Sequence, residues 1–289
     1  MKLNFLVFLA LFFVNSMTCH ATNKVVYGED NRIDIVEATS NIYVELAKST
    51  AGRITPSRLK VKDNVVTITG DSLVSRGICS DERFANQISA TDCSGFLVGE
   101  DLLVTAGHCM RDMRDCSGYR WVFDFKYDGS DTYEVPQSSV YECAEIVDQK
   151  LSRITKEDYA LIRLDRKVTD REPLRVRKTG RIADGTELFI IGHPTGLPTK
   201  VADGAAVRTN TNDYYFVSNL DSFGGNSGSA VFDADSGTVE GILVRGEVDY
   251  VYDPSAGCRR VKQCDSDSCR GEDVTRITRV AKLMETLNN

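Results

Sequence analysis

The sequence is poor in histidine, carries no excess of positive charge and has no apolar run of membrane-spanning length. It contains three histidines in 289 residues, and its formal net charge is −7. This acidic balance argues against nucleic acid or an anionic membrane as the partner. The apolar run at residues 5–14 is about half the roughly 20 residues that a transmembrane helix needs, so we expect no stable membrane association.

The first residues have the pattern of an export signal. Lys2 precedes the apolar run, and a small and polar stretch follows that run and ends at Ala21. This pattern is typical of a secretory signal peptide cleaved after Ala21. We therefore expect residues 1–21 to be removed from a protein that is secreted or periplasmic. A lipoprotein anchor on Cys19 is the alternative, but the residues before Cys19 lack the usual apolar residue.

Cysteine usage agrees with export. Removal of the signal peptide leaves eight cysteines, at positions Cys79, Cys93, Cys109, Cys116, Cys143, Cys258, Cys264 and Cys269. An even number behind an export signal predicts up to four disulfides in an oxidising compartment. A zinc site is the alternative for the last three cysteines. No histidine lies near them and their spacing is not paired CxxC, so we expect no metal and no cofactor.

The rest of the sequence reads as many short strands. The candidates are residues 65–68, 96–98, 102–104, 121–125, 160–164, 188–191, 214–217, 230–232 and 239–244. Clusters of Gly, Asp and Ser separate them, which favours an all-β barrel or sandwich. From Arg276 onwards, apolar residues recur at helical spacing and predict a C-terminal helix that docks on the body. No linker is evident, so two barrels would be packed halves of one unit.

His108 is the candidate general base. Imidazole titrates near neutral pH and is the usual side chain for this role. His108 follows a strand–turn–strand run at residues 96–104, where a loop can present its ring to a cleft. The alternative is a structural histidine beside a disulfide. His193, in the turn-like Gly192-His193-Pro194-Thr195-Gly196, is interpreted as structural.

Ser227 is the candidate nucleophile. It lies in Gly224-Gly225-Asn226-Ser227-Gly228. A serine nucleophile needs an exposed hydroxyl and two backbone N–H groups directed at the developing oxyanion, and a tight glycine-rich turn supplies both. Gly225 and Ser227 are the expected oxyanion donors. The alternative is an ordinary Gly/Ser hairpin loop.

Asp158 is the candidate third member of a catalytic triad. It stands directly before the apolar run Tyr159-Ala160-Leu161-Ile162, at the edge of a core strand. A carboxylate there can be buried and still reach a histidine Nδ1–H, which holds the imidazole in the tautomer that accepts the serine proton. The alternative is a solvated acid at a strand start. Asp165, beside Arg166 at the far end of the strand, is interpreted as a surface charge.

These three segments resemble the motifs of the chymotrypsin-like serine endopeptidases. Thr-Ala-Gly-His108-Cys is similar to Thr-Ala-Ala-His-Cys of that family, Asp158-Tyr-Ala-Leu to Asp-Ile-Ala-Leu, and Gly225-Asn-Ser227-Gly-Ser to Gly-Asp-Ser-Gly-Gly. The order His, Asp, Ser is also the order in the family. The resemblance implies an all-β fold of two packed antiparallel β-barrels with a C-terminal helix. It also implies protein or peptide substrates, a monomer, and a disulfide between Cys93 and Cys109.

The bacterial branch that includes the glutamyl endopeptidases is the closer resemblance. Asn226 and Ser229 point to that branch, and residues 25–32 resemble its mature start. Animal trypsins carry an Asp before the nucleophile, which pairs with the new N-terminal amine on activation. Asn226 has no charge, so that switch cannot operate in the same way here.

The primary specificity pocket departs from the glutamyl enzymes. Asp221 lies six residues before Ser227. In trypsin-like members an Asp at that spacing binds Arg or Lys, because a carboxylate gives charge-assisted recognition of a basic group. The alternative for Asp221 is a loop acid that caps a turn. Residues 241–246 resemble the pocket-wall strand, and they lack the histidine by which glutamyl enzymes hold an acidic side chain.

Arg245 and Gly246 are the remaining candidate substrate-binding residues in that strand. Arg245 has three alternative roles: it points away, it pairs with Asp221 and neutralises it, or it favours acidic groups further along the substrate. Lys24 precedes Val25, so an enzyme that cuts after Lys would release residues 22–24, a candidate short propeptide, by itself. The protease domain would then be residues 25–289.

The sequence therefore predicts a secreted serine endopeptidase that cleaves after Arg or Lys through an acyl-enzyme. Cleavage after Glu or Asp is the alternative within the enzyme class. A protease-like binding module that has lost catalysis is the alternative outside it.

Overall fold

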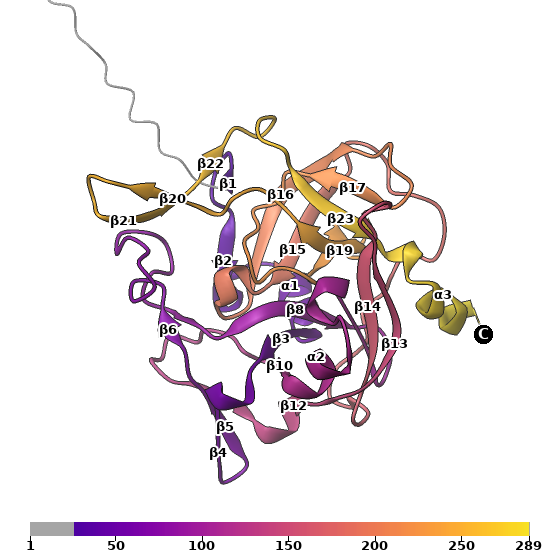
Figure 1. Cartoon of the computed structure of the whole chain (residues 1–289), viewed down its shortest axis with the longest axis horizontal. Helices are drawn as coiled ribbons and strands as arrows, with labels where there is room; N and C mark the ends of the chain where they lie inside the picture. The colour runs from indigo at the N-terminus through magenta and orange to yellow at the C-terminus, as the bar shows by residue number, and fades with distance from the viewer. Residues whose placement is uncertain (1–25, 289) are drawn as a thin grey trace, which may run out of the picture.

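The computed structural model describes residues 26–288 as two β-sheet halves packed against each other (Figure 1). The predicted signal peptide, residues 1–21, and the candidate propeptide, residues 22–24, lie outside the described residues. Among residues 26–288, no helix combines the length and the apolar composition needed to span a bilayer.

The first half is an open, antiparallel, curled sheet. In spatial order its strands are β12 (Val140–Tyr141), β10 (Arg120–Phe123), β3 (Thr50–Ile54), β8 (Thr91–Leu97), β9 (Leu102–Thr105), β14 (Asp158–Leu164) and β13 (Cys143–Leu151). A smaller sheet of β11 (Tyr133–Pro136), β5 (Val65–Ile68) and β4 (Leu59–Lys62) lies beside it.

The second half is a closed antiparallel barrel. Its strands in order are β15 (Glu187–Gly192), β18 (Ala230–Asp233), β19 (Val239–Arg245), β23 (Glu272–Arg276), β17 (Tyr215–Ser218) and β16 (Lys200–Thr209), and β16 pairs with β15 to close the ring. Strand β2 (Arg32–Asp34) adds to the outside of β16. The two-stranded ladders are β1 (Val26–Tyr27) with β22 (Gln263–Cys264), β20 (Tyr250–Asp253) with β21 (Cys258–Val261), and β6 (Asp71–Ser72) with β7 (Ile88–Ser89).

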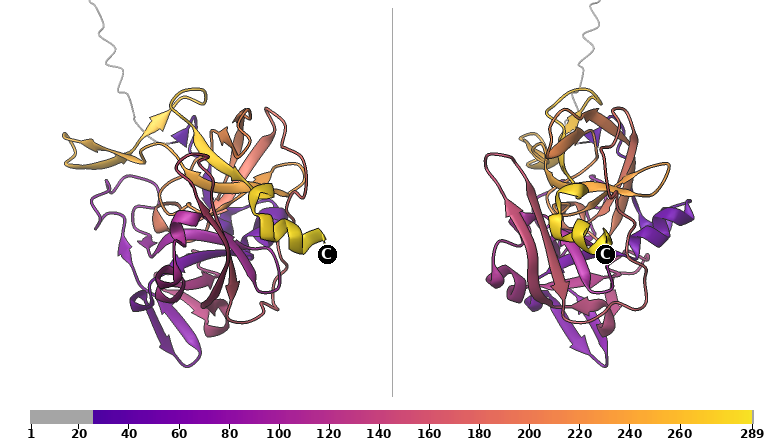
Figure 2. Two further views of the ribbon diagram at one scale, coloured as in Figure 1. Left: turned by 45° about the vertical axis from the view of Figure 1, so that its right-hand side comes forward. Right: turned by 90° about the vertical axis from the view of Figure 1, so that its right-hand side faces the viewer.

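Short helices lie between and after the strands. The α-helices are α1 (Asn41–Ala47), α2 (Met113–Gly118) and α3 (Ala281–Asn288), and the 3₁₀ turns are η1 (Ile35–Glu37), η2 (Pro56–Arg58), η3 (Gly107–Cys109), η4 (Gln137–Ser139), η5 (Pro194–Gly196) and η6 (Ile277–Arg279). Figure 2 shows α1 and α3 projecting from the body of the molecule. The turn η3 carries His108, the candidate general base.

One hydrophobic core joins the two halves. Phe96 and Leu161 of the curled sheet belong to the same buried cluster as Phe189 and Ile242 of the barrel. Burial of a Phe, Leu or Ile side chain stabilises a fold by roughly 1.5–3 kcal/mol, so a shared core makes the two halves one unit. Residues on both halves can therefore be held in fixed positions across their boundary.

The predicted all-β architecture with a C-terminal helix is confirmed, with two differences. The first barrel is not closed by hydrogen bonds, since no ladder joins β12 to β13. The helix begins at Ala281 rather than near Arg276, because residues Glu272–Arg276 form β23 between β19 and β17.

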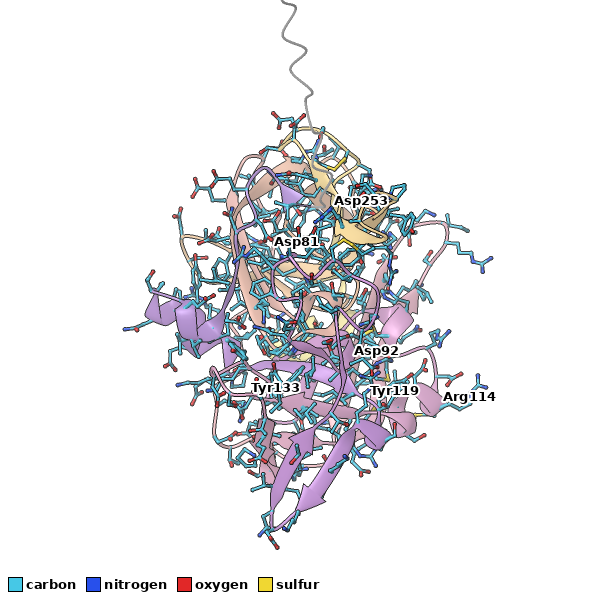
Figure 3. The ribbon with its side chains drawn as sticks, turned by 90° about the vertical axis from the view of Figure 1, so that its left-hand side faces the viewer. Asp81, Asp92, Arg114, Tyr119, Tyr133 and Asp253 are labelled. Carbon is cyan, nitrogen blue, oxygen red and sulfur yellow. A yellow bond between two sulfur atoms is a disulfide. The ribbon has the colours of Figure 1, made fainter. Side chains whose placement is uncertain are left out.

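Four disulfides hold the loops to this scaffold. The pairs are Cys79–Cys258, Cys93–Cys109, Cys116–Cys143 and Cys264–Cys269. The first pair ties the β20–β21 hairpin to the loop before β7. Arg260 strengthens that junction by pairing with Asp81 at 2.9 Å and with Asp253 at 2.9 Å, and Figure 3 shows these two acids on one face.

We expect loss of the Cys79–Cys258 bond to destabilise the protein by about 2–5 kcal/mol, because its 179-residue separation greatly restricts the unfolded chain. A Cys79→Ser, Cys258→Ser double variant, unfolded in urea with the other disulfides intact, measures this. The matched control is Cys264→Ser, Cys269→Ser, whose separation is 5 residues. An equal or larger cost for the control would contradict the prediction.

Candidate active site

His108 and Asp158 are brought together by the pairing of β9 with β14. Ala160 of β14 lies opposite Thr105 of β9, so the start of one strand meets the turn that follows the other. Asp158 Oδ2 lies 2.8 Å from His108 Nδ1, and Oδ1 accepts a hydrogen bond of 2.9 Å from the His108 backbone N–H. The Asp158 side chain is 3% exposed and that of His108 is 36% exposed. The Nδ1 side of the ring therefore faces the carboxylate, and this arrangement favours the tautomer that carries its proton on Nδ1.

Gly107 explains the departure from an alanine before this histidine. A Cβ at Gly107 would overlap the Lys150 carbonyl and lie 2.8 Å from the carbonyl oxygen of Tyr159. The β13–β14 hairpin thus packs directly against the turn. This close approach lets Asp158 reach both the ring and the backbone of His108.

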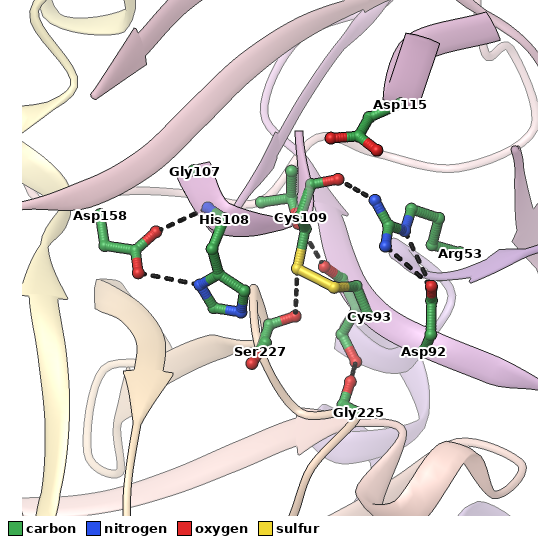
Figure 4. The surroundings of a disulfide bond; sticks show 12 residues. Arg53, Asp92, Cys93, Gly107, His108, Cys109, Asp115, Asp158, Gly225 and Ser227 are labelled. Atoms are coloured by element: carbon green, nitrogen blue, oxygen red, sulfur yellow. Dashed lines mark hydrogen bonds and ion pairs between the residues drawn. A yellow bond between two sulfur atoms is a disulfide. The ribbon is translucent and has the colours of Figure 1, made fainter. Parts of the chain in front are cut away.

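The other side of the turn is fixed by the Cys93–Cys109 disulfide and by Arg53 (Figure 4). Arg53 donates to the Cys109 carbonyl and binds the Asp92 carboxylate through Nε and Nη2 at 2.8 Å each. Its guanidinium stacks 4.0 Å from the centre of the Tyr119 ring, and Figure 3 shows Asp92 and Tyr119 as neighbours on the surface.

Cys93, His108 and Cys109 come close enough together for their ligand atoms to share one metal ion. The two sulfurs are joined in a disulfide, so neither is available as the thiolate that a metal would need. This cluster therefore does not fit a metal ion.

Ser227 lies beside the His108 ring, on a turn from the second half (Figure 4). The Ser227 carbonyl accepts a 2.8 Å hydrogen bond from the Ser94 N–H, and it lies 3.8 Å from Cys109 Sγ. The Ser94 hydroxyl donates to the Gly225 carbonyl at 2.8 Å. Strand β8 of the first half thus positions the serine turn of the second half against the histidine turn.

The turn leaves two backbone donors free. Among residues 26–288, no hydrogen bond uses the N–H of Gly225 or of Ser227. Gly225 has φ +97°, and a Cβ there would overlap the His193 carbonyl and lie 2.7 Å from the Gly196 nitrogen, so only glycine fits. Both amides are available for the oxyanion role predicted for them.

His193 is a buried structural residue in this region. Its ring is 0% exposed, stacks on Phe125 at 5.7 Å and places Nδ1 2.9 Å from the Leu197 carbonyl. Burial lowers the pKa of His193 to about 4.

The buried ring predicts a pH dependence of stability. Below about pH 6.5 the unfolded chain takes up a proton at His193, while the folded protein stays neutral there until about pH 4. Stability is therefore lost as the pH falls through this window, by about 3 kcal/mol at 1.36 kcal/mol per pKa unit. Urea unfolding at several pH values should show a smaller loss for His193→Gln than for the wild type. Parallel losses in both proteins would contradict the prediction.

Asp221 faces the N-terminal segment. Its carboxylate accepts hydrogen bonds from the backbone N–H groups of Tyr27 at 2.8 Å and Asn31 at 3.0 Å. The side chain is buried, and burial raises the pKa of Asp221 to about 7. Its two oxygens thus anchor residues 27–31 to the loop before Ser227, a connection that the spacing of the motif does not reveal.

Arg245 does not pair with Asp221, so the second of its three alternatives is excluded. Its Nε donates to Asp273 at 3.0 Å, its Nη2 donates to the Lys156 carbonyl at 3.0 Å, and its Nη1 lies 3.7 Å from Asp158 Oδ2. Arg245 therefore places a positive charge behind the carboxylate that holds His108.

Two further acids, near the loop that precedes Ser227, were missed by sequence analysis. Glu272, at the start of β23, is buried, and burial raises its pKa to about 7. Asp249 accepts a 2.8 Å hydrogen bond from the Gly224 N–H, and burial raises its pKa as well. A cavity of about 360 Å³ opens beside Gly224 and Gly225, with Asp249 in its lining. Neither acid lies in a motif, so no sequence signal marks them.

A histidine held by a buried carboxylate, next to a serine on an amide-lined turn, is the arrangement of a protease with a chymotrypsin-like fold. A family model described as a trypsin-like peptidase domain matches residues 93–242, more than half of the chain. The chain belongs to the trypsin-like peptidase family.

Two solved structures share the fold. A structure described as Glu endopeptidase in complex with MPD is 17% identical, with a TM-score of 0.50, and the match covers 91% of this chain and 97% of that one. Human heparin binding protein is 10% identical, with a TM-score of 0.53, and the match covers 85% of this chain and 93% of that one. No curated protein sequence matches the chain.

Proposed function

We propose that this protein is a serine endopeptidase in which Ser227 is the nucleophile, His108 the general base and Asp158 the residue that orients His108. The observation that carries the proposal is the pair of contacts from the buried Asp158 carboxylate to His108, at 2.8 Å and 2.9 Å, with Ser227 beside the ring. Because one carboxylate contacts both the ring and the backbone N–H of His108, these contacts support one ring orientation and one tautomer.

The chemistry follows from this arrangement. Nε2 of His108 takes the proton of the Ser227 hydroxyl as Oγ attacks the peptide carbonyl, and the imidazolium that forms is stabilised by Asp158. The N–H groups of Gly225 and Ser227 stabilise the negative charge on the tetrahedral intermediate. His108 then returns the proton to the leaving amine. Water, activated by the same histidine, hydrolyses the acyl-enzyme and restores Ser227.

The proposal includes export and a mature chain that starts at Val25. Four disulfides fit an oxidising compartment, either the periplasm or the medium. Val26 is 0% exposed and Tyr27 is 5% exposed, and both pair with β22. Residues 26 and 27 are thus part of the fold, so the proposed cleavage has to fall before them.

The proposed preference is for Arg or Lys on the acyl side of the cleaved bond. Asp249 lines the cavity beside Gly224 and Gly225, Asp221 and Glu272 are buried near the same loop, and none of the three forms an ion pair within residues 26–288. Unpaired acids favour a basic substrate side chain and repel an acidic one. This charge distribution argues against the Glu or Asp preference.

A panel of fluorogenic peptides that differ only in the residue before the scissile bond tests the specificity. We expect the highest kcat/KM with Arg and Lys, and negligible hydrolysis with Glu and Asp. Preferred cleavage after Glu or Asp would overturn the specificity while leaving the serine mechanism in place. A folded protein that hydrolyses none of the peptides would favour the binding-module alternative.

A further inference from the structure

A polar cavity of about 350 Å³ lies at the end of β23, where three arginines meet. Arg276 is the last residue of β23, Arg279 ends the turn η6, and Arg181 comes from the segment before β15. This cavity shares no lining residue with the cavity next to the Ser227 turn. The arginine cluster is therefore separate from the candidate active site.

Arg276 is the buried member of the cluster and is 4% exposed. Its Nε and Nη2 donate to the Asn212 carbonyl at 3.3 Å and 2.8 Å, and Nη2 also donates to the carbonyl and side-chain oxygens of Asn210. Within residues 26–288, its Nη1 donates no hydrogen bond and no carboxylate pairs with the guanidinium. A buried guanidinium is stabilised by a negative charge, which these neutral oxygens do not supply.

Arg181 and Arg279 bring two more positive charges to the cavity. Arg181 pairs with Asp213, and Arg279 pairs with Glu157 at 2.9 Å. The Arg181 side chain is 47% exposed and that of Arg279 is 40% exposed, so a dissolved ion can reach both. Among the described residues, Asp213 is the only acid that lines the cavity, and the three guanidinium groups outnumber it.

The positive charges of the cluster oppose one another. Burial lowers the pKa of Arg276, and the charge of Arg181 lowers it further. Nearby acids act in the opposite direction, but none of them forms an ion pair with Arg276 within residues 26–288. An anion among the guanidinium groups would relieve this repulsion, and it would accept a hydrogen bond from the unused Nη1.

We propose that this cavity is a binding site for a phosphate or sulfate group. Three guanidinium groups line it, and Thr278 adds a hydroxyl. A tetrahedral anion can accept hydrogen bonds from donors on several sides at once, whereas the two oxygens of a carboxylate lie in one plane with their carbon. The site goes beyond the proposed peptidase function and does not depend on it.

Thermal unfolding at rising concentrations of inorganic phosphate or sulfate tests the site, with the ionic strength held constant by NaCl. We expect the midpoint to rise and to saturate, because a ligand that binds only the folded chain stabilises it by mass action. Sodium acetate should give a much smaller rise. No rise beyond that in NaCl alone, or an equal rise with acetate, would overturn the proposal.

Variants assign the binding to this cavity. Arg276→Gln should weaken phosphate binding by about 10- to 100-fold, as expected for the loss of one charged donor. Arg181→Gln should weaken it by about tenfold, and this more exposed position serves if Arg276→Gln folds poorly. Asp213→Asn should tighten phosphate binding, which a general loss of stability would not do. Arg114→Gln, which removes an exposed arginine paired with Asp112, is the matched control and should bind as the wild type does.

O-phosphoserine distinguishes the two sources of such a group. Tighter binding of O-phosphoserine than of inorganic phosphate would support the site and assign it to an ester group on a larger molecule. Equal or weaker binding would support the site and assign it to the free ion. Wild-type affinity for phosphate in both Arg276→Gln and Arg181→Gln would overturn the proposal, because the ion would then bind elsewhere.

Discussion

Ser227→Ala should lower kcat by about 10⁶-fold, because the residual rate comes only from substrate binding and the oxyanion donors. The change removes one oxygen from a turn whose backbone is held by other bonds, including that of the Ser94 N–H to the Ser227 carbonyl. The fold should therefore persist. Initial rates on an Arg peptide, with equal near-UV circular dichroism of the two proteins, measure the effect.

Ser229→Ala is the control from the same turn. The Ser229 hydroxyl is 0% exposed and donates to Asn226 Oδ1 at 3.4 Å, so it has no access to substrate. We expect its loss to lower activity far less than the loss of Ser227. If Ser227→Ala kept the activity of the wild type, the nucleophile would have to lie elsewhere.

Asp158→Asn should lower kcat by about 10⁴-fold. The His108 backbone N–H already donates to Asp158 Oδ1, so an asparagine would keep its oxygen there and turn its NH₂ group toward Nδ1. An NH₂ group at that position donates a hydrogen bond, so Nδ1 of His108 has to be unprotonated in order to accept it. The ring proton then moves to Nε2, which can no longer take the serine proton.

Asp165→Asn, at the other end of the same region, is the control for that variant. Asp165 pairs with Arg166 at 3.0 Å at the surface, and its removal should leave kcat near that of the wild type. Equal losses in the two variants would indicate a general effect on β14. A normal pH profile for Asp158→Asn would contradict the orienting role.

The fold could be predicted where a short run of apolar and β-branched residues marks a strand. Residues 65–68 and 239–244 were expected as strands and lie within β5 and β19. Strand β13 was missed, because it is a mostly solvent-exposed edge strand with two register shifts and no sustained alternation. The apolar residues after Arg276 predicted a helix too early, since Arg276 itself completes a ladder with Gly241.

The candidate site was predictable where short contiguous motifs define it. His108 and Ser227 each lie in such a motif, and Asp158 gains its position from the same strand pairing that forms the core. The acids near the Ser227 turn could not be placed from the sequence. Asp221 has the spacing of a pocket acid, but its partners lie 194 and 190 residues away in sequence. Glu272 lies 50 residues from Ser222, in a segment without a motif.

The orientation of the Arg245 side chain could not be predicted from the sequence either. Its sequence position allowed three orientations, and the choice depends on Asp273 of β23 and on the Asp158 carboxylate of β14. Strand β23 pairs with β19 in the barrel and β14 belongs to the curled sheet, so both partners reach Arg245 only when the two halves have folded together. Tertiary charge pairing, which the local sequence does not encode, thus decides which acids Arg245 contacts.

The most direct test of the central claim is covalent labelling with a fluorophosphonate, followed by peptide mapping. The account predicts one adduct, on Ser227, that is absent in Ser227→Ala and forms much more slowly in Asp158→Asn. A folded protein that remains unlabelled, or that carries the adduct on another residue, would contradict it.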